Sequence, residues 1–310
     1  MTVAETIAEA GGTVLWLDRP GGVRVRAAVF GEPGPRGWCA FLPGYTEFIE
    51  KNLETMADLR ARGFAVVTLD WRGQGLSSRL LADRHKGSVL RMEDHRDDAL
   101  AVLERVDAFD RGPMFLLGHS MGGHLALRLL MHRPEIARAA VLSAPMVDIT
   151  RIGLPRPAAC ALIESLCALG LRDRYVFGGT GYGPKRRRFE GNRLTHDTER
   201  FDRMHRLIDA QPDLVITDPT FGWVRAAFRS IRYAMAPGRL EVVRTPILIA
   251  KAGREAIVSN RAIDEAVHRL PNARLTVSPE ANHEILRETD SVRAGFWRSV
   301  DDFLAGLPGG

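Results

Sequence analysis

Cysteine is scarce in this chain, and the few cysteines present match no known site. The 310 residues include only Cys39, Cys160 and Cys167, whose spacings fit no zinc-binding pattern. Cys160 and Cys167 lie on a predicted helix, where their separation along the axis of about 10 Å is too large for a disulfide. We therefore expect reduced, structural thiols and no zinc site.

The chain also lacks a long apolar run. Its longest mostly apolar stretch, near residues 157–171, contains Glu164 and is shorter than the roughly 20 residues that a membrane-spanning helix needs. Residues 1–12 contain acidic side chains and no basic-then-apolar sequence, so they do not resemble a secretory signal. We therefore expect a cytoplasmic protein without a transmembrane helix.

A strong excess of one charge is absent as well. The net charge is +5, and residues 146–236 contain 15 Lys and Arg against 10 Asp and Glu, whereas the rest of the chain is balanced. This excess is too dilute for a nucleic-acid-binding surface, and no helix-turn-helix, zinc-finger or RNA-binding motif accompanies it. With 45% hydrophobic and 26% charged residues, the composition is that of a globular protein without a nucleic-acid partner.

Short apolar runs alternate with helical patterns along most of the chain. The predicted strands cover 13–17, 23–30, 38–43, 64–70, 114–119, 139–145, 245–251 and 273–278. The predicted helices cover 53–62, 93–109, 121–132, 260–270 and 291–305. Such alternation predicts an α/β fold, with a mostly parallel sheet and helices on both of its faces.

Residues 146–236 interrupt this alternation. They contain helical patterns, Pro and Gly, but no convincing succession of strand and helix. We interpret them as an insertion, because the pattern of buried strands resumes directly afterwards. The predicted domains are an α/β core formed by residues 1–145 and 237–310 and a cap formed by residues 146–236.

One motif joins a predicted strand to a predicted helix. Residues 118–123 read G-H-S-M-G-G, which is the G-x-S-x-G pattern of a nucleophile elbow. Small residues are needed there because the turn is tight and the helix approaches the strand closely. Ser120 lies at the N-terminus of the helix, where backbone N–H groups favour a developing oxyanion. We predict that Ser120 is a nucleophile, the alternative being an idle serine in a glycine-rich turn.

A serine nucleophile needs a base, usually a histidine that a carboxylate orients. In this arrangement the acid and the histidine follow the serine, on loops after late strands. His283 follows the last predicted strand in P-E-A-N-H-E, whereas His268 continues a helical pattern, so we predict His283 as the base. For the acid we predict Glu255, in A-G-R-E, and Asp148, in S-A-P-M-V-D, is the alternative.

An oxyanion hole needs two N–H donors. One is expected from Met121, which follows the serine, and the other from the loop after the strand at 38–43. That loop reads L-P-G-Y-T-E-F, in which Gly44 permits a close backbone approach and Tyr45 is the predicted donor. A simple Pro-Gly turn is the alternative. The loop D-W-R-G-Q-G-L-S-S at 70–78 is predicted to be structural, with glycines that form turns.

Taken in order, these motifs resemble those of the α/β-hydrolases, specifically the bacterial lysophospholipase and monoacylglycerol lipase branch of the serine hydrolases. The matching sequences are P-G-Y-T-E-F, D-W-R-G-Q-G-L-S-S, G-H-S-M-G-G, A-G-R-E-A-I-V-S-N and N-H-E-I-L. The resemblance implies an eight-stranded sheet, a mainly helical cap inserted after the sixth strand, and hydrolysis of carboxylic esters through an acyl-enzyme without a cofactor. The triad and oxyanion donors it implies are Ser120, Glu255, His283, Tyr45 and Met121.

Two positions depart from the pattern of this branch. Pro43 stands where many relatives have His, and Glu255 stands where most have Asp. The first departure falls on the predicted oxyanion loop, and the second falls on the predicted acid. Asp148 therefore stays open as an alternative to Glu255.

The sequence of the predicted cap indicates the class of substrate. Residues 157–171 are apolar around nearly the whole helix, which suits an acyl-chain tunnel, contact with a lipid surface, or a buried cap helix. The basic run at 185–188 suits contact with phospholipid head groups or a solvated loop. We expect a lysophospholipid or monoacylglycerol-type ester as substrate, with transient membrane-surface contact through the cap. The alternatives are a small-ester carboxylesterase and a non-catalytic ligand-binding module.

Overall fold

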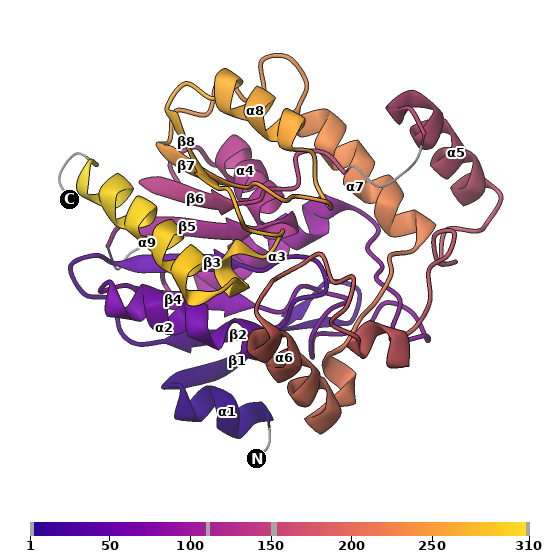
Figure 1. The fold of residues 1–310 in the computed structure, drawn as a ribbon, viewed down its shortest axis with the longest axis horizontal. Coiled ribbons are helices and arrows are strands. Elements are labelled where there is room, and N and C mark those ends of the chain that lie inside the picture. The colour runs from indigo at the N-terminus through magenta and orange to yellow at the C-terminus, as the bar shows by residue number, and fades with distance from the viewer. Residues whose placement is uncertain (1–2, 110–111, 150–153, 308–310) are drawn as a thin grey trace.

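The computed structural model describes residues 3–109, 112–149 and 154–307 (Figure 1). At its centre is an eight-stranded sheet with the order β1-β2-β4-β3-β5-β6-β7-β8. The strands are β1 (Gly12–Arg19), β2 (Val23–Phe30), β3 (Trp38–Leu42), β4 (Ala65–Leu69), β5 (Met114–His119), β6 (Ala139–Ser143), β7 (Ile247–Ala252) and β8 (Ala273–Ser278). Strand β2 pairs antiparallel with both β1 and β4, and the other neighbouring strands of this sheet pair parallel. The mostly parallel α/β fold predicted from the sequence is confirmed.

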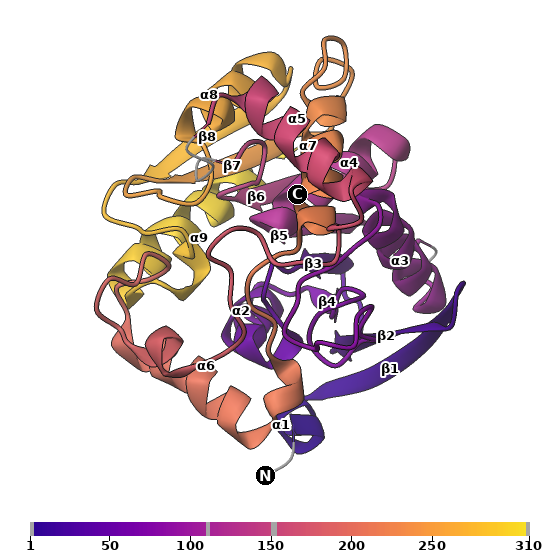
Figure 2. The same ribbon diagram turned by 90° about the vertical axis from the view of Figure 1, so that its right-hand side faces the viewer.

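Helices cover both faces of the sheet (Figures 1 and 2). On one face lie α1 (Val3–Glu9), α2 (Leu53–Ala61) and α9 (Asp290–Ala305), and on the other lie α3 (Met92–Arg105), α4 (Met121–His132) and α8 (Asn260–Arg269). Successive side chains of a strand enter opposite layers: Phe41 packs with α2 and α9, whereas Ala40 and Leu42 pack with α3 and α4. The central strands are therefore apolar throughout, because both of their faces are buried.

Two local features differ from the sequence-based expectations. Helix α1 was not predicted, because it has only seven residues; Ile7 is the buried apolar side chain among those of its residues 5–9. Helix α3 ends at Arg105, four residues before the predicted end at Phe109. The helix cannot continue because Asp107 adopts a positive φ of 52°.

Between β6 and β7 the chain leaves the sheet. This stretch holds α5 (Arg156–Ala168), α6 (Thr198–Ala210) and α7 (Phe221–Ala234), joined by loops and the 3₁₀ turns η2 (Pro184–Arg187) and η3 (Pro212–Leu214). Helix α5 packs on α7, and α6 packs on the 3₁₀ turn η1 (Ile49–Asn52) that precedes α2. We refer to residues 146–236 as the cap segment. Of the helices in the described residues, none has the length and apolar character needed to cross a membrane.

Candidate active site

Ser120 lies on a sharp turn between β5 and α4. Its φ of 52° and ψ of −115° place a non-glycine residue in a strained region of backbone conformation. The turn is as tight as the motif predicts: a Cβ atom on Gly122 would lie 1.9 Å from the backbone oxygen of Leu42, and one on Gly118 would lie 2.6 Å from that of Gly122. Side chains at these positions would push α4 away from the sheet.

The three predicted triad side chains meet at the carboxyl ends of the strands. His283 Nε2 lies 2.9 Å from Ser120 Oγ, and His283 Nδ1 lies 2.7 Å from Glu255 Oε2. Glu255 follows β7 and His283 follows β8, so adjacent parallel strands deliver the acid and the base to one edge of the sheet. Ser120 is 7% exposed and His283 4% exposed, so the hydrogen bonds between them are shielded from water.

The surroundings of Glu255 keep its carboxylate ionised. Burial raises the pKa of Glu255, but the hydrogen bond from His283 and those from the Ile257 and Val258 amides lower it, and the net pKa is below the usual value. The Ala256, Ile257 and Val258 amides donate to Oε1 at 2.9, 2.7 and 3.2 Å, which leaves Oε2 for the imidazole. An ionised carboxylate only accepts hydrogen bonds, so His283 Nδ1 carries the proton and Nε2 presents its lone pair to the serine hydroxyl.

Asp148, the alternative acid, is held elsewhere. Its carboxylate accepts a hydrogen bond from the Ile149 amide at 2.8 Å and forms an ion pair with Arg156. The single proton on His283 Nδ1 is directed at Glu255 instead. Of the two acids that the sequence left open, the structure brings Glu255 to the imidazole.

The predicted oxyanion loop lies beside the elbow because β3 is the parallel neighbour of β5, with Leu42 paired to Gly118. The amides on either side of Tyr45 have side-chain acceptors: Gly44 N donates to Glu47 Oε2 at 2.6 Å and Thr46 N donates to Gln74 Oε1 at 2.8 Å. These bonds fix the loop around the Tyr45 amide. The second predicted donor, Met121, is the first residue of α4, where an amide has no partner within the helix.

The side chain of Tyr45 links the oxyanion loop to the cap segment. Its hydroxyl donates to the Thr217 carbonyl oxygen at 2.9 Å, and its ring centroid lies 4.5 Å from that of Trp223 at the start of α7. Burial raises the pKa of Tyr45 well above its usual value, so the phenol stays protonated and keeps this bond. The position of the Tyr45 amide therefore depends on the cap as well as on the core.

A buried chain of charges joins the oxyanion loop to the histidine loop. Lys51 Nζ lies 3.3 Å from Glu47 Oε1 and 2.6 Å from Glu284 Oε1, and all three side chains are almost fully buried. Glu284 directly follows His283, and Glu47 holds the Gly44 amide. Burial raises the pKa of Glu284, but Lys51 and Arg287 lower it to about 2, so this carboxylate remains charged and the link persists at neutral pH.

Sequence reasoning missed the supporting residues around the triad. Gln74 lies in the loop at 70–78, which was predicted to be structural, and it also holds the oxyanion loop through Thr46. His119 is buried and its ring centroid lies 5.0 Å from that of His283. Burial lowers the pKa of His119, which favours its neutral form, so it adds no positive charge beside the base. The sequence did offer one indication that His119 lies at the site, which is its position inside the G-x-S-x-G motif.

The two ambiguous parts of the cap segment show mixed character. Helix α5 buries Ala159, Ile163 and Cys167 and exposes Leu162, so it is neither fully buried nor fully exposed. In the basic run at 185–188, Arg186 pairs with Asp218 and Arg187 pairs with Asp209. Two of the four basic side chains are thus engaged by cap carboxylates rather than displayed for a ligand.

The three cysteines are free, and Cys39 and Cys167 are buried. Burial raises the pKa of Cys39 to about 12, which leaves this thiol unreactive at neutral pH. The described residues contain no group of three or more His, Cys, Asp and Glu side chains placed to hold a metal ion.

Comparison with known proteins places the chain among the hydrolases. The sequence family described as serine aminopeptidase, S33, matches residues 33–290. The probable lysophospholipase L2 of Haemophilus influenzae is 34% identical over 263 residues, which cover 84% of this chain and 81% of that protein. Lysophospholipase L2 of Escherichia coli K12 is 34% identical over 273 residues, which cover 84% of this chain and 78% of that protein.

Solved structures share the fold at low sequence identity. A soluble variant of monoglyceride lipase from Saccharomyces cerevisiae has a TM-score of 0.74 at 18% identity, over 96% of this chain and 97% of that one. Monoacylglycerol lipase from Paleococcus ferrophilus has a TM-score of 0.70 at 20% identity, over 91% and 98%. These structures confirm the α/β-hydrolase fold. With the family match over most of its length, the chain belongs to the serine aminopeptidase S33 family of α/β-hydrolases, as the order of its motifs predicts.

Proposed function

We propose that this chain is a serine ester hydrolase that cleaves lysophospholipids or monoacylglycerols through an acyl-enzyme intermediate. The observation that carries the proposal is the series of hydrogen bonds from Ser120 to His283 and from His283 to Glu255, at 2.9 and 2.7 Å. The relatives from Haemophilus influenzae and Escherichia coli are named probable lysophospholipase L2 and lysophospholipase L2, and these names support a lipid ester as the substrate.

In the first half of the proposed reaction, Ser120 Oγ attacks the ester carbonyl while His283 Nε2 takes the hydroxyl proton. The negative carbonyl oxygen is stabilised by the Tyr45 and Met121 amides, and Glu255 stabilises the imidazolium that forms. The tetrahedral intermediate collapses when the bond to the alcohol oxygen breaks. His283 returns its proton to that oxygen, which releases the alcohol and leaves Ser120 esterified.

In the second half, water replaces the alcohol. His283 removes a proton from a water molecule, the resulting hydroxide attacks the acyl carbon, and the same two amides stabilise the oxyanion. The ester bond to Ser120 breaks, and the serine oxygen takes the proton back from His283. The products are a carboxylic acid and the enzyme in its starting state, so the cycle needs no cofactor.

The cap segment supports contact with a lipid surface as part of this proposal. Eleven large hydrophobic side chains are exposed in the described residues, and five of them lie within residues 154–177. The most exposed are Leu169 at 75% and Phe177 at 74%. We propose that these side chains form one apolar surface, and such surfaces are typical of sites that bind lipid or protein. The proposed enzyme is cytoplasmic and reaches its substrate through this part of the cap.

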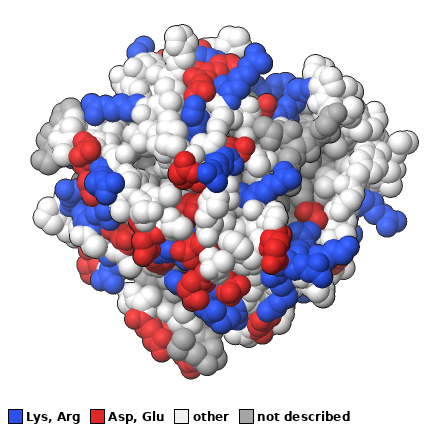
Figure 3. Space-filling model, in the orientation of Figure 1, with Lys and Arg blue, Asp and Glu red and all other residues white. Residues whose placement is uncertain are grey.

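The distribution of surface charge does not favour nucleic acid as a partner. On the face shown in Figure 3, basic and acidic side chains are interspersed rather than separated into a basic field. Many of the arginines form ion pairs with carboxylates on the same surface, for example Arg229 with Glu164 and Arg62 with Asp301. A phosphate backbone needs a continuous basic surface to displace its counterions.

The substrate class is tested with a series of p-nitrophenyl esters from acetyl to palmitoyl, together with a monoacylglycerol and a lysophosphatidylcholine. We expect kcat/KM to rise about fourfold for each added methylene that the site buries, since each contributes about 0.8 kcal/mol. Both lipids should release fatty acid. Fastest turnover of the acetyl ester, with neither lipid hydrolysed, would instead identify a small-ester carboxylesterase. Binding of the lipids without turnover of any ester would identify a non-catalytic module.

The lipid-surface contact is tested with the double substitution Leu169→Asp and Phe177→Asp. Because burying each side chain contributes about 2 kcal/mol, we expect at least a tenfold loss of binding to phosphatidylglycerol vesicles in a sedimentation assay. Turnover of p-nitrophenyl butyrate in solution should change by less than about twofold. Val242→Asp is the matched control, because Val242 is 61% exposed and lies outside the cap segment. Equal vesicle binding by the double variant and the control would contradict the proposed contact.

A further inference from the structure

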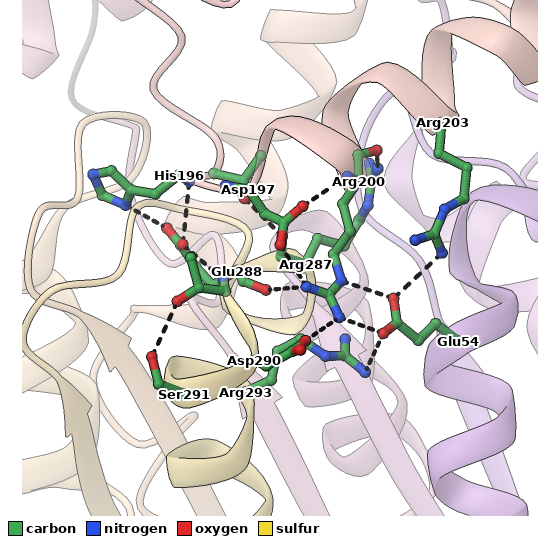
Figure 4. A network of polar contacts seen from close by, with 12 residues as sticks. Glu54, His196, Asp197, Arg200, Arg203, Arg287, Glu288, Asp290, Ser291 and Arg293 are labelled. Carbon is green, nitrogen blue, oxygen red and sulfur yellow. Dashed lines mark hydrogen bonds and ion pairs between the residues drawn. The ribbon is translucent and has the colours of Figure 1, made fainter.

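One part of the cap segment lies along the loop that carries His283. Residues 194–200 run beside residues 282–289, as the close-up in Figure 4 shows for the labelled members of both segments. The Glu284 amide donates to the Leu194 carbonyl oxygen at 2.8 Å, and Thr195 Oγ1 donates to the Arg287 carbonyl oxygen at 2.6 Å. The histidine loop is therefore fixed partly by the cap.

Glu288 is the centre of these contacts. Its side chain is fully buried, and its Oε1 accepts the Asn282 amide at 2.8 Å and lies 2.9 Å from His196 Nδ1. Its Oε2 accepts the His196 amide at 3.1 Å and the Thr289 amide at 3.2 Å. Asn282 immediately precedes His283, so one carboxylate ties both ends of the histidine loop to the cap.

Arg200 anchors the cap side of this arrangement to the core. Its guanidinium donates to the Glu288 carbonyl oxygen at 3.0 Å and to Asp197 at 2.6 Å. It also donates to Glu54 at 2.8 Å, on α2, and to Asp290 at 2.6 Å, at the start of α9 (Figure 4). The segment that holds the histidine loop is thus itself held by two helices of the core.

Loss of the Glu288 carboxylate would leave its N–H donors without an acceptor. Buried amides without an acceptor cost free energy, so the chain at Asn282 would move to find other partners. His283 is the next residue, and its Nε2 has to stay within hydrogen-bond distance of Ser120. A displacement of about 1 Å at a reacting group reduces the rate by about 10²-fold.

We propose that Glu288 is a positioning residue, which holds His283 in its reactive place by joining the histidine loop to residues 194–200 of the cap. The inference rests on the proposed function, because it presupposes that His283 activates Ser120. The inference gives the cap a second role besides substrate binding, because residues 194–200 help to hold the base His283 in place. Glu288 acts through the Asn282 and His196 contacts and touches neither the substrate nor the serine.

The test compares Glu288→Gln with the wild type in the rate at which a fluorophosphonate labels Ser120. The glutamine NH₂ group would face N–H donors, so we expect the second-order rate constant to fall about 10- to 100-fold. The KM for p-nitrophenyl butyrate should change by less than about threefold, so that the loss falls on kcat. His196→Ala keeps the Glu288 carboxylate and the backbone contact at 196, and it should lower the labelling rate about threefold to tenfold.

The matched control is Glu199→Gln, which makes the same change of charge on α6 at an exposed side chain paired with Arg206. It should label at the wild-type rate. A purely structural role for Glu288 would lower the melting temperature or the final labelled fraction and leave the rate constant of the folded molecules unchanged, and that result would overturn the inference. If the wild type itself is not labelled at Ser120, the proposed function fails instead, which keeps the two failures distinguishable.

Discussion

Ser120→Ala should lower the rate of ester hydrolysis by about 10⁴- to 10⁶-fold. The substitution removes the atom that forms the acyl-enzyme, so no rearrangement of His283 or Glu255 can restore the same pathway. Folding should be nearly unaffected, because the substitution removes one hydroxyl, whose hydrogen bond within the described residues is the one with His283 Nε2. The measurement is the initial rate with p-nitrophenyl butyrate, together with the melting temperature of both proteins.

Ser143→Ala is the matched control for this prediction. Ser143 is also buried at the carboxyl end of a neighbouring strand, and its hydroxyl has no hydrogen-bond partner within the described residues. Its backbone oxygen accepts the Ser120 amide, a contact that the substitution retains. We expect activity within about twofold of the wild type. Hydrolysis by Ser120→Ala at a rate close to that of this control would remove Ser120 from the reaction.

Glu255→Gln should lower kcat by about 10²- to 10⁴-fold, since the acid of a triad fixes the tautomer of its histidine. In the wild type the Glu255 carboxylate accepts a hydrogen bond from His283 Nδ1. A glutamine can instead present its NH₂ group to Nδ1 and favour the wrong tautomer of the histidine. Because the pKa of Glu255 is lowered, its carboxylate stays ionised to a more acidic pH than an ordinary glutamate does. The contribution of Glu255 should therefore be constant between about pH 6 and pH 9.

Asp148→Asn separates the two acids that the sequence left open. Because Asp148 pairs with Arg156 and the Ile149 amide, we expect this variant to keep kcat within about threefold of the wild type. The kinetic measurement is the pH dependence of kcat for both variants and the wild type. Full activity of Glu255→Gln together with a large loss in Asp148→Asn would show that the acid is Asp148.

The fold was predictable because its signals are local. Runs such as Met114–His119 and Ile247–Ala252 are short, apolar and separated by helical patterns, as strands buried on both faces must be. The elbow was predictable for the same reason, since the glycines around Ser120 are dictated by the backbone of one turn. The order of serine, acid and histidine along the chain then restricted the choice of base to His268 and His283.

The support of the site was not predictable, because it depends on contacts between distant parts of the chain. Glu288 and His196 are 92 positions apart, and Lys51 and Glu284 are 233 apart. Nothing in the neighbouring sequence distinguishes these charges from solvated ones. The cap was hard to interpret for a related reason: α5 is apolar on most sides, and only its packing on α7 determines which side is buried.

The proposed mechanism requires transient esterification of Ser120, and trapping that ester is the most direct test. Hydrolysis of p-nitrophenyl butyrate is quenched with acid during turnover, and the digested protein is analysed by mass spectrometry. We predict a butyryl group on the peptide that contains Ser120, at the serine itself, and no such group in Ser120→Ala. Turnover by the wild type with the butyryl group on another side chain, or with none on Ser120, would contradict the account.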